Sequence, residues 1–142
     1  MKRLISITFA IIILATAFTA GAQQITAQRV IANIPFAFTA NNKTLPAGKY
    51  TITVLNSSSD RGALQIRSMN GRFSAMVLTN TVIGKSSDTA KLVFERYDDR
   101  YFFAQVQLAG ESTTLAALHS NKEHKHAVTT AKKKSLVVIV AG

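Results

Sequence analysis

Residues 91–108 read KLVFERYDDRYFFAQVQL, and this stretch decides the fold class. Val, Phe and Tyr, which favour strands, are frequent in the two runs on either side of Asp98-Asp99, and Asp is a common turn residue. The stretch therefore predicts a β-hairpin with a two-residue turn. That turn would place aromatic and branched side chains opposite one another, in the pairs Phe94 with Phe103 and Leu92 with Gln105.

Apolar side chains occupy every second position between residues 29 and 38. This period of two predicts a strand with one row facing a core. The inward row consists of Val30, Ala32, Ile34, Phe36 and Phe38. Pro35 lacks the amide hydrogen that a sheet ladder needs, so we expect this strand at a sheet edge, or pairing only after the proline.

Clusters of Asn, Ser, Asp and Gly separate the strand-like stretches and predict turns. One such turn is expected at residues 41–43. Asn70-Gly71 predicts a hairpin turn of type I′, because Asn and Gly both tolerate the positive φ that this turn requires. The remaining strands are predicted over residues 50–54, 64–67 and 73–78, followed by a buried closing strand over residues 135–141.

Short strands at this spacing predict an all-β fold, either an antiparallel sandwich or a small barrel of about seven strands. One short helix is expected before the C-terminal strand, over residues 121–131, because Ser120 and Glu123 fit a capping box. The 142-residue sequence is the length of one domain, and it contains no cysteine. The fold must therefore rest on an apolar core and not on disulfides.

The first 22 residues have the plan of a signal peptide. Lys2 and Arg3 precede an apolar run over residues 4–18, and Ala20 and Ala22 fit a cleavage site. The run is shorter than the ~20 residues that span a bilayer, although an uncleaved anchor is the alternative. We expect a mature β domain over residues 23–142, secreted or periplasmic and without a transmembrane span. An exported chain without cysteine is typical of a bacterial envelope.

Two pairs of motifs carry a resemblance to a known family. IPFAF at residues 34–38 is followed by LPAGKY at residues 45–50, and KLVFERY at residues 91–97 is followed by DRYF at residues 99–102. With these motifs the chain resembles a family of uncharacterised small secreted bacterial β proteins, over about residues 30–108. The resemblance implies an exported β domain and carries over no catalytic residue.

The sequence contains no motif of a known catalytic centre. It has no G-x-S-x-G elbow, no glycine-rich phosphate loop and no dinucleotide fingerprint. All four aspartates fall in predicted loops or turns, at Asp60, Asp88, Asp98 and Asp99. We therefore expect a protein that is not an enzyme and needs no cofactor.

The sequence is strongly basic, with 17 Lys and Arg against 7 Asp and Glu and a formal charge of +10, or +8 without Lys2 and Arg3. Residues 119–134, here named the basic segment, hold the lysines Lys122, Lys125, Lys132, Lys133 and Lys134. Such a segment is either a solubilising face or a site for an anionic partner, for which we expect envelope polymer or lipid headgroups. Export and the lack of an RNA-binding signature argue against nucleic acid.

The three histidines of the sequence, His119, His124 and His126, also lie in the basic segment. Imidazole is a ligand for copper, nickel and zinc. On a helix, however, His124 and His126 diverge by about 200°, so only an extended chain would bring them to one side. With no cysteine and only Glu123 as a nearby carboxylate, we expect a solvated polar segment and no metal site.

These observations predict an exported, non-catalytic β domain that acts as a structural or binding module in the cell envelope or outside the cell. The alternative is a carrier that holds a small apolar ligand inside a β-barrel. A carrier requires an enclosed apolar cavity of about 300 Å³ or more, whereas a module requires a filled core.

Overall fold

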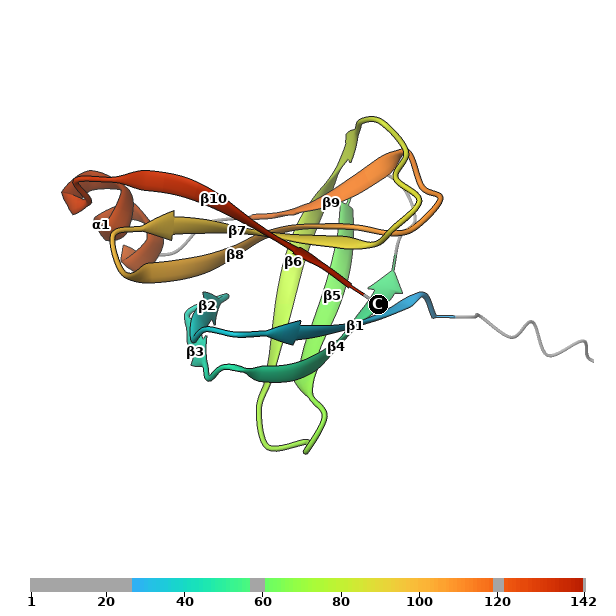
Figure 1. Ribbon diagram of the computed structural model, residues 1–142, viewed down its shortest axis with the longest axis horizontal. Coiled ribbons are helices and arrows are strands. Elements are labelled where there is room, and N and C mark those ends of the chain that lie inside the picture. The colour runs from blue at the N-terminus through green and yellow to red at the C-terminus, as the bar shows by residue number, and fades with distance from the viewer. Residues whose placement is uncertain (1–26, 57–60, 119–121, 142) are drawn as a thin grey trace, which may run out of the picture.

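The computed structural model describes residues 27–56, 61–118 and 122–141, so the expected signal peptide lies outside the described part. This part contains ten strands and one helix (Figure 1). In chain order they are β1 (Arg29–Ile34), β2 (Phe38–Ala40), β3 (Lys43–Leu45), β4 (Gly48–Asn56), β5 (Arg61–Ser68), β6 (Ser74–Ile83), β7 (Lys91–Tyr97), β8 (Arg100–Gln107), β9 (Thr113–Ala117), α1 (Lys122–Thr130) and β10 (Lys134–Val140).

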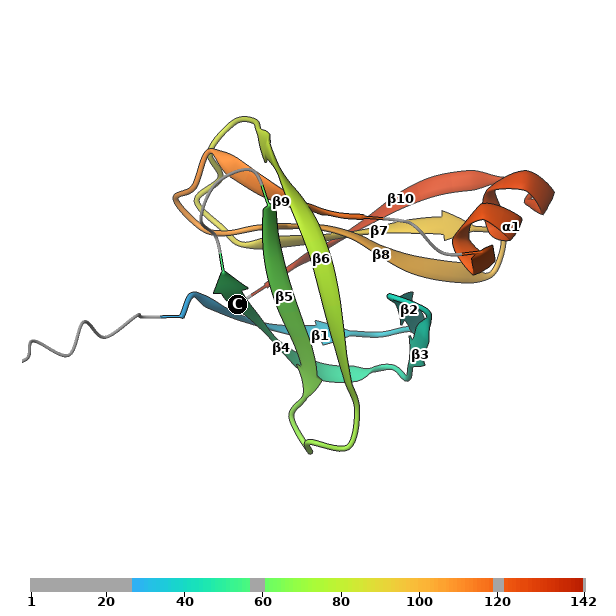
Figure 2. The ribbon, with the colours of Figure 1, turned by 180° about the vertical axis from the view of Figure 1, so that it is seen from behind.

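The ten strands form a single sheet that does not close. Neighbouring strands follow the order β1-β4-β5-β6-β9-β8. Beyond these, β8 pairs with β7, and β7 pairs with β10. All pairs along this path are antiparallel, whereas β2 joins β8 in parallel, with Thr39 opposite Phe102. The sheet bends over on itself, so that one arm, with β7, β8 and β10, lies across from the other arm, with β1 and β4 (Figures 1 and 2).

The predicted all-β class and the short helix before the last strand are confirmed, but the strand count of about seven is wrong. Two of the additional strands, β2 and β3, have three residues each and are too short to show a period. The third, β9, reads TTLAA, in which only Leu115 is buried. Its place between β6 and β8 is set by partners distant in the sequence.

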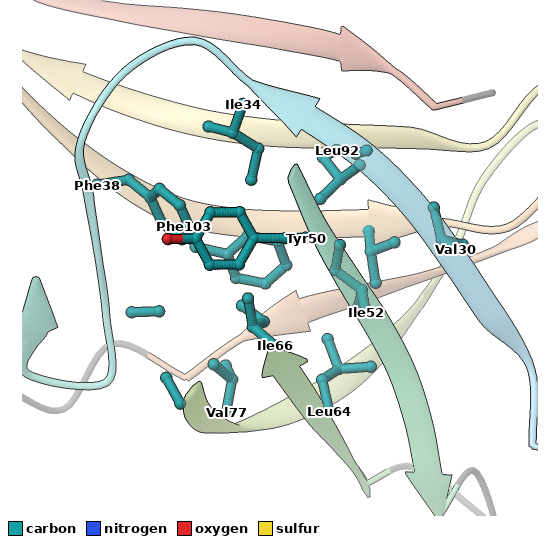
Figure 3. Packing of buried hydrophobic residues seen from close by; sticks show 14 of the residues in the cluster. Val30, Ile34, Phe38, Tyr50, Ile52, Leu64, Ile66, Val77, Leu92 and Phe103 are labelled. Carbon is teal, nitrogen blue, oxygen red and sulfur yellow. The ribbon is translucent and has the colours of Figure 1, made fainter. Parts of the chain in front are cut away.

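The core lies between the two arms of the bent sheet and is centred on aromatic rings (Figure 3). Phe94 of β7 has no exposed surface. Its ring lies edge-on to those of Phe36, Phe38 and Phe103, with centroids 5.1, 5.3 and 5.8 Å away. Tyr50 of β4 extends the cluster, because its ring lies 5.3 Å from that of Phe38. Both arms therefore bury their inner faces against the same group of rings.

The alternation predicted for residues 29–38 is confirmed except at one position. Val30, Ala32, Ile34 and Phe38 are buried, but Phe36 is only partly buried. The strand stops at Ile34, before the proline, so Phe36 lies in the connection to β2 and no longer continues the row. Its ring still contacts that of Phe94 and also stacks on that of Tyr101, with centroids 3.9 Å apart.

The hairpin of β7 and β8 has the predicted two-residue turn, and Phe94 pairs with Phe103. The second predicted pair is wrong, because Leu92 lies opposite Val106 and not Gln105. A register shift between Val93 and Phe94 accounts for the difference, since a bulge leaves one residue of β8 without a partner.

The turn at Asn70-Gly71 is not of the predicted type I′. Only Gly71 has positive φ, at 73°, and five residues separate β5 from β6. The Asn70 side chain stabilises the turn, because its Oδ1 accepts hydrogen bonds from Ser68 Oγ and the Arg72 amide at 2.7 and 3.0 Å. Positive φ at both central residues occurs instead between β2 and β3, where Asn41 and Asn42 have φ of 46° and 64°.

The last strand, β10, is not the buried closing strand that its apolar sequence predicts. Among the described strands it pairs only with β7, so it forms an edge of the sheet. Val137 and Ile139 pack against the core, whereas Leu136, Val138 and Val140 are 64, 52 and 61% exposed. A run of branched residues predicts burial on both faces, but nothing among the described residues covers the outer face of this strand.

Replacing Phe94 by Ala is expected to lower the free energy of unfolding by about 3 to 5 kcal/mol, because a buried ring is lost and a cavity remains. Phe73 provides a matched control, since its ring is 40% exposed. Phe73→Ala should change stability far less. Urea unfolding followed by circular dichroism measures both changes, and equal losses would contradict the assigned core.

Candidate functional site

The structure describes most of the basic segment. Its helix agrees with the prediction, since α1 covers residues 122–130 against the expected 121–131. Lys125 is exposed on α1, Lys132 and Lys133 are exposed in the turn after it, and Lys134 begins β10. His119 lies outside the described residues, and so do the side chains of the other members of the segment on α1, Lys122, His124 and His126.

The helix is fixed to the outer face of the β7–β8 hairpin by a small apolar cluster. Ala127 has no exposed surface and packs with Tyr97 and Phe102, while Ala131 covers its edge. The two rings meet edge to face, with centroids 5.9 Å apart. Because α1 rests on this pair, the turn after it comes next to the tip of the hairpin (Figure 1).

Asp98 joins the hairpin tip to the turn that bears the lysines. Its carboxylate accepts the backbone amides of Lys132 and Lys133 at 3.2 and 3.1 Å. Its own amide donates to the Lys133 carbonyl at 3.0 Å. These three hydrogen bonds hold the backbone of both lysines, while their side chains stay exposed. We name Lys132, Lys133 and their backbone contacts with Asp98 the basic turn.

Lys134 differs from the other two lysines because it packs on the hairpin. Its Nζ lies 3.5 Å from Glu95 Oε1 and 5.4 Å from the centre of the Tyr97 ring. The hydrogen-bonding contact with Tyr97 and the negative charge of Glu95 raise the pKa of Lys134. Burial and the hydrogen bond from its hydroxyl to Glu95 Oε2, 2.9 Å long, raise the pKa of Tyr97.

Arg96 adds a further positive charge at the tip. Its Nε donates to the Asp98 carbonyl at 2.7 Å, and its guanidinium lies 5.4 Å from the centre of the Tyr101 ring. One nitrogen of the guanidinium is 3.8 Å from the Asp99 carboxylate, whose side chain is fully exposed. This ion pair is weak, because water screens it on every side.

The surface around the basic turn therefore combines six basic with three acidic side chains. The acidic ones are Glu95, Asp98 and Asp99, and the basic ones are Arg96, Arg100, Lys125, Lys132, Lys133 and Lys134. The sequence indicated the lysines and took the aspartates as turn residues only. No local sequence pattern indicates that Asp98 contacts a segment 34 residues away, so the sequence did not predict the acidic residues of the site.

The three histidines are not brought into a metal site by anything that the structure describes. Within the described residues, no group of three or more His, Cys, Asp or Glu could hold a metal ion. Because the side chains of His124 and His126 are not among them, the sequence prediction on metal binding stays a prediction.

A hollow of about 310 Å³ lies where the start of β1 approaches the end of β10. Val30 and Ile31 line one side, and Ala90, Leu108 and Ala141 line the other. It is open to solvent at the surface, and Ala141 donates a backbone hydrogen bond to Ala90 along its wall. The hollow is thus a notch at the unclosed seam of the sheet.

Comparison with protein-family models, with curated proteins and with solved structures finds no match for this chain. The resemblance based on residues 34–50 and 91–102 consequently stays a prediction from sequence. Across the described ranges, no helix has the length and apolar character needed to cross a membrane.

Asp98→Asn is expected to lower the midpoint of thermal unfolding by several degrees, because the two backbone amides reach different carboxylate oxygens and Asn replaces one of these acceptors by a donor. Asn also tolerates the positive φ of 53° at this position. Asp99→Asn is the matched control, since the Asp99 carboxylate is fully exposed. Equal midpoints of thermal unfolding for the two variants would contradict the role given to Asp98.

Raising the pH should weaken the fold above about pH 10, where tyrosine ionises in the unfolded chain. The pKa of Tyr97 and that of Lys134 are both raised in the fold, so their contribution is complete below this pH and is lost as the pH rises through the folded values. Tyr97→Phe should unfold with a shallower alkaline slope in urea titrations between about pH 9 and 11.5. An unchanged slope would refute the assignment to Tyr97.

Proposed function

We propose that this chain is an exported, non-catalytic β domain that acts as a binding module in the cell envelope or outside the cell, and that the basic turn holds anionic envelope polymer. The observation that carries this proposal is the geometry of the basic turn. Two neighbouring lysines, Lys132 and Lys133, are exposed on a backbone that Asp98 fixes from outside the turn.

A fixed backbone favours binding because fewer conformations are lost when the ligand arrives. The side chains of Lys132 and Lys133 have no acidic partner among the described residues, so their charges are available to a polyanion. Lys134 contributes charge but is held by Glu95 and Tyr97. The module thus offers a small positive surface whose strength depends on salt.

The core supports a module more than it supports a carrier. The space between the two arms of the sheet is occupied by the rings of Phe38, Tyr50, Phe94 and Phe103. The notch of about 310 Å³ at the seam lies outside these rings and is open. A carrier in the sense of the alternative needs an enclosed apolar cavity instead.

Lys132→Gln combined with Lys133→Gln should weaken binding to acidic polysaccharide and to anionic vesicles in co-sedimentation. Lys134 is kept, because its contacts with the hairpin contribute to folding. Binding by the unchanged protein should be strong in dilute buffer and nearly lost at 1 M salt, since the Debye length falls from about 8 Å at physiological ionic strength to about 3 Å.

The matched control is Lys43→Gln combined with Lys85→Gln, which removes the same charge from exposed positions elsewhere. If the control loses as much binding, net charge and not the basic turn attracts the polymer. Binding that ignores salt would likewise overturn the proposal. Thermal melts of all variants establish that the substitutions leave the fold intact.

A further inference from the structure

A polar groove of about 390 Å³ lies on the outer face of β1, β4 and β5, away from the basic turn. The inner face of these strands carries the core residues Val30, Ile52 and Leu64 (Figure 3). The alternate residues face outward, and six of the polar side chains that line the groove are exposed or only partly buried. These are Arg29, Thr51, Thr53, Gln65, Arg67 and Asn70, which we name the outer-face groove.

The strand register brings these side chains together. Arg29 of β1 lies opposite Thr53 of β4, and Thr53 lies opposite Gln65 of β5, so the three form one row across the sheet. Thr51 and Arg67 form the next row along. With neighbouring strands ~4.8 Å apart and same-face residues ~6.8 Å apart, the Cα atoms of Arg29 and Arg67 are about 12 Å from each other.

The turn between β5 and β6 supports Arg67 at one end of the groove. A side chain added at Gly71 would come within 3.3 Å of Arg67 Nη2, so the absence of a Cβ leaves room for the guanidinium beside the turn. The turn itself is held by Asn70, whose Oδ1 accepts from Ser68 Oγ and from the Arg72 amide. Arg67 therefore lies against a backbone that is already ordered.

The charges of this groove are not neutralised by any residue that the structure describes. No Asp or Glu occurs on β1, β4 or β5, or in the turn at residues 69–73. The side chains of Arg29, Thr53, Gln65 and Arg67 have no hydrogen-bond or ion-pair partner among the described residues. The basic turn differs in this respect, because Asp98, Asp99 and Glu95 adjoin it.

We propose that the outer-face groove binds an acidic saccharide chain, with one carboxylate on each of Arg29 and Arg67. A guanidinium donates two parallel N–H bonds to a carboxylate, and this geometry favours carboxylates over most other partners. The hydroxyl and amide groups between the two arginines both donate and accept hydrogen bonds, as sugar hydroxyls do. Met69, which is exposed at the edge, offers an apolar surface to the C–H face of a ring.

The spacing favours a chain over a single anion. A free phosphate needs donors that converge on one point, whereas the two arginines start about 12 Å apart with neutral polar groups between them. This proposal goes beyond the function of the basic turn. It holds even if that turn binds nothing.

The test is titration of the purified protein with a short oligogalacturonate, followed by calorimetry and by amide chemical shifts. Arg29→Gln and Arg67→Gln should each weaken binding about tenfold, which corresponds to one charge-assisted hydrogen-bonded contact. Arg67→Lys should weaken it as well, because lysine keeps the charge but cannot donate the paired bonds. Amide shifts should change at Thr53 and Gln65.

Arg100→Gln is the matched control, since it removes the same charge at the far end of the sheet, and Lys132→Gln with Lys133→Gln separates the groove from the basic turn. In both variants the oligomer should still change the amide shifts of Thr53 and Gln65 as it does in the unchanged protein, because these residues report on the groove alone. Four results would overturn the proposal: no binding of the oligomer, equal binding of neutral oligogalactose, equal binding of inorganic phosphate, or full affinity in Arg29→Gln and Arg67→Gln. Melts of every variant exclude unfolding as the cause of a loss.

Discussion

The burial of the Phe94 ring between the two arms of the sheet holds this fold together. Phe36 and Phe38 reach the ring from the β1–β2 side and Phe103 from β8, each with its edge or face against the neighbour. In a chain without cysteine, no covalent link substitutes for this contact. The position of both arms, and of every surface on them, depends on the packing of these rings.

The β7–β8 hairpin connects the core with the basic turn. Phe94 and Phe103, in the middle of the hairpin, face the core. Tyr97 and Phe102, near its tip, pack against Ala127 of α1. Asp98, at the very tip, then fixes the turn that follows the helix. One hairpin thus orders a helix and a strand that come about 30 residues later in the chain.

The two basic surfaces differ in what surrounds them, and this difference gives them different chemistry. Around the basic turn, three acidic side chains offset half of the six basic charges. The net attraction for an anion there is therefore weakened, and it depends on the salt concentration. In the outer-face groove, Arg29 and Arg67 are accompanied by neutral hydroxyl and amide groups. Such a surface selects for hydrogen-bonding geometry as well as for charge.

The sequence by itself determined the all-β class, the short helix and the inward rows, because side-chain alternation and helix caps are local properties of the chain. Val30, Ile34 and Phe38 were placed correctly for this reason. The bulge in β8, the insertion of β9 and the exposed edge of β10 were decided by the tertiary structure alone. So were the contact of Asp98 with the lysines and the shared row of Arg29 with Gln65. These features depend on which strands pair and in which register. The pairing follows from the free energy of burying the whole core, which cannot be calculated from a local sequence pattern.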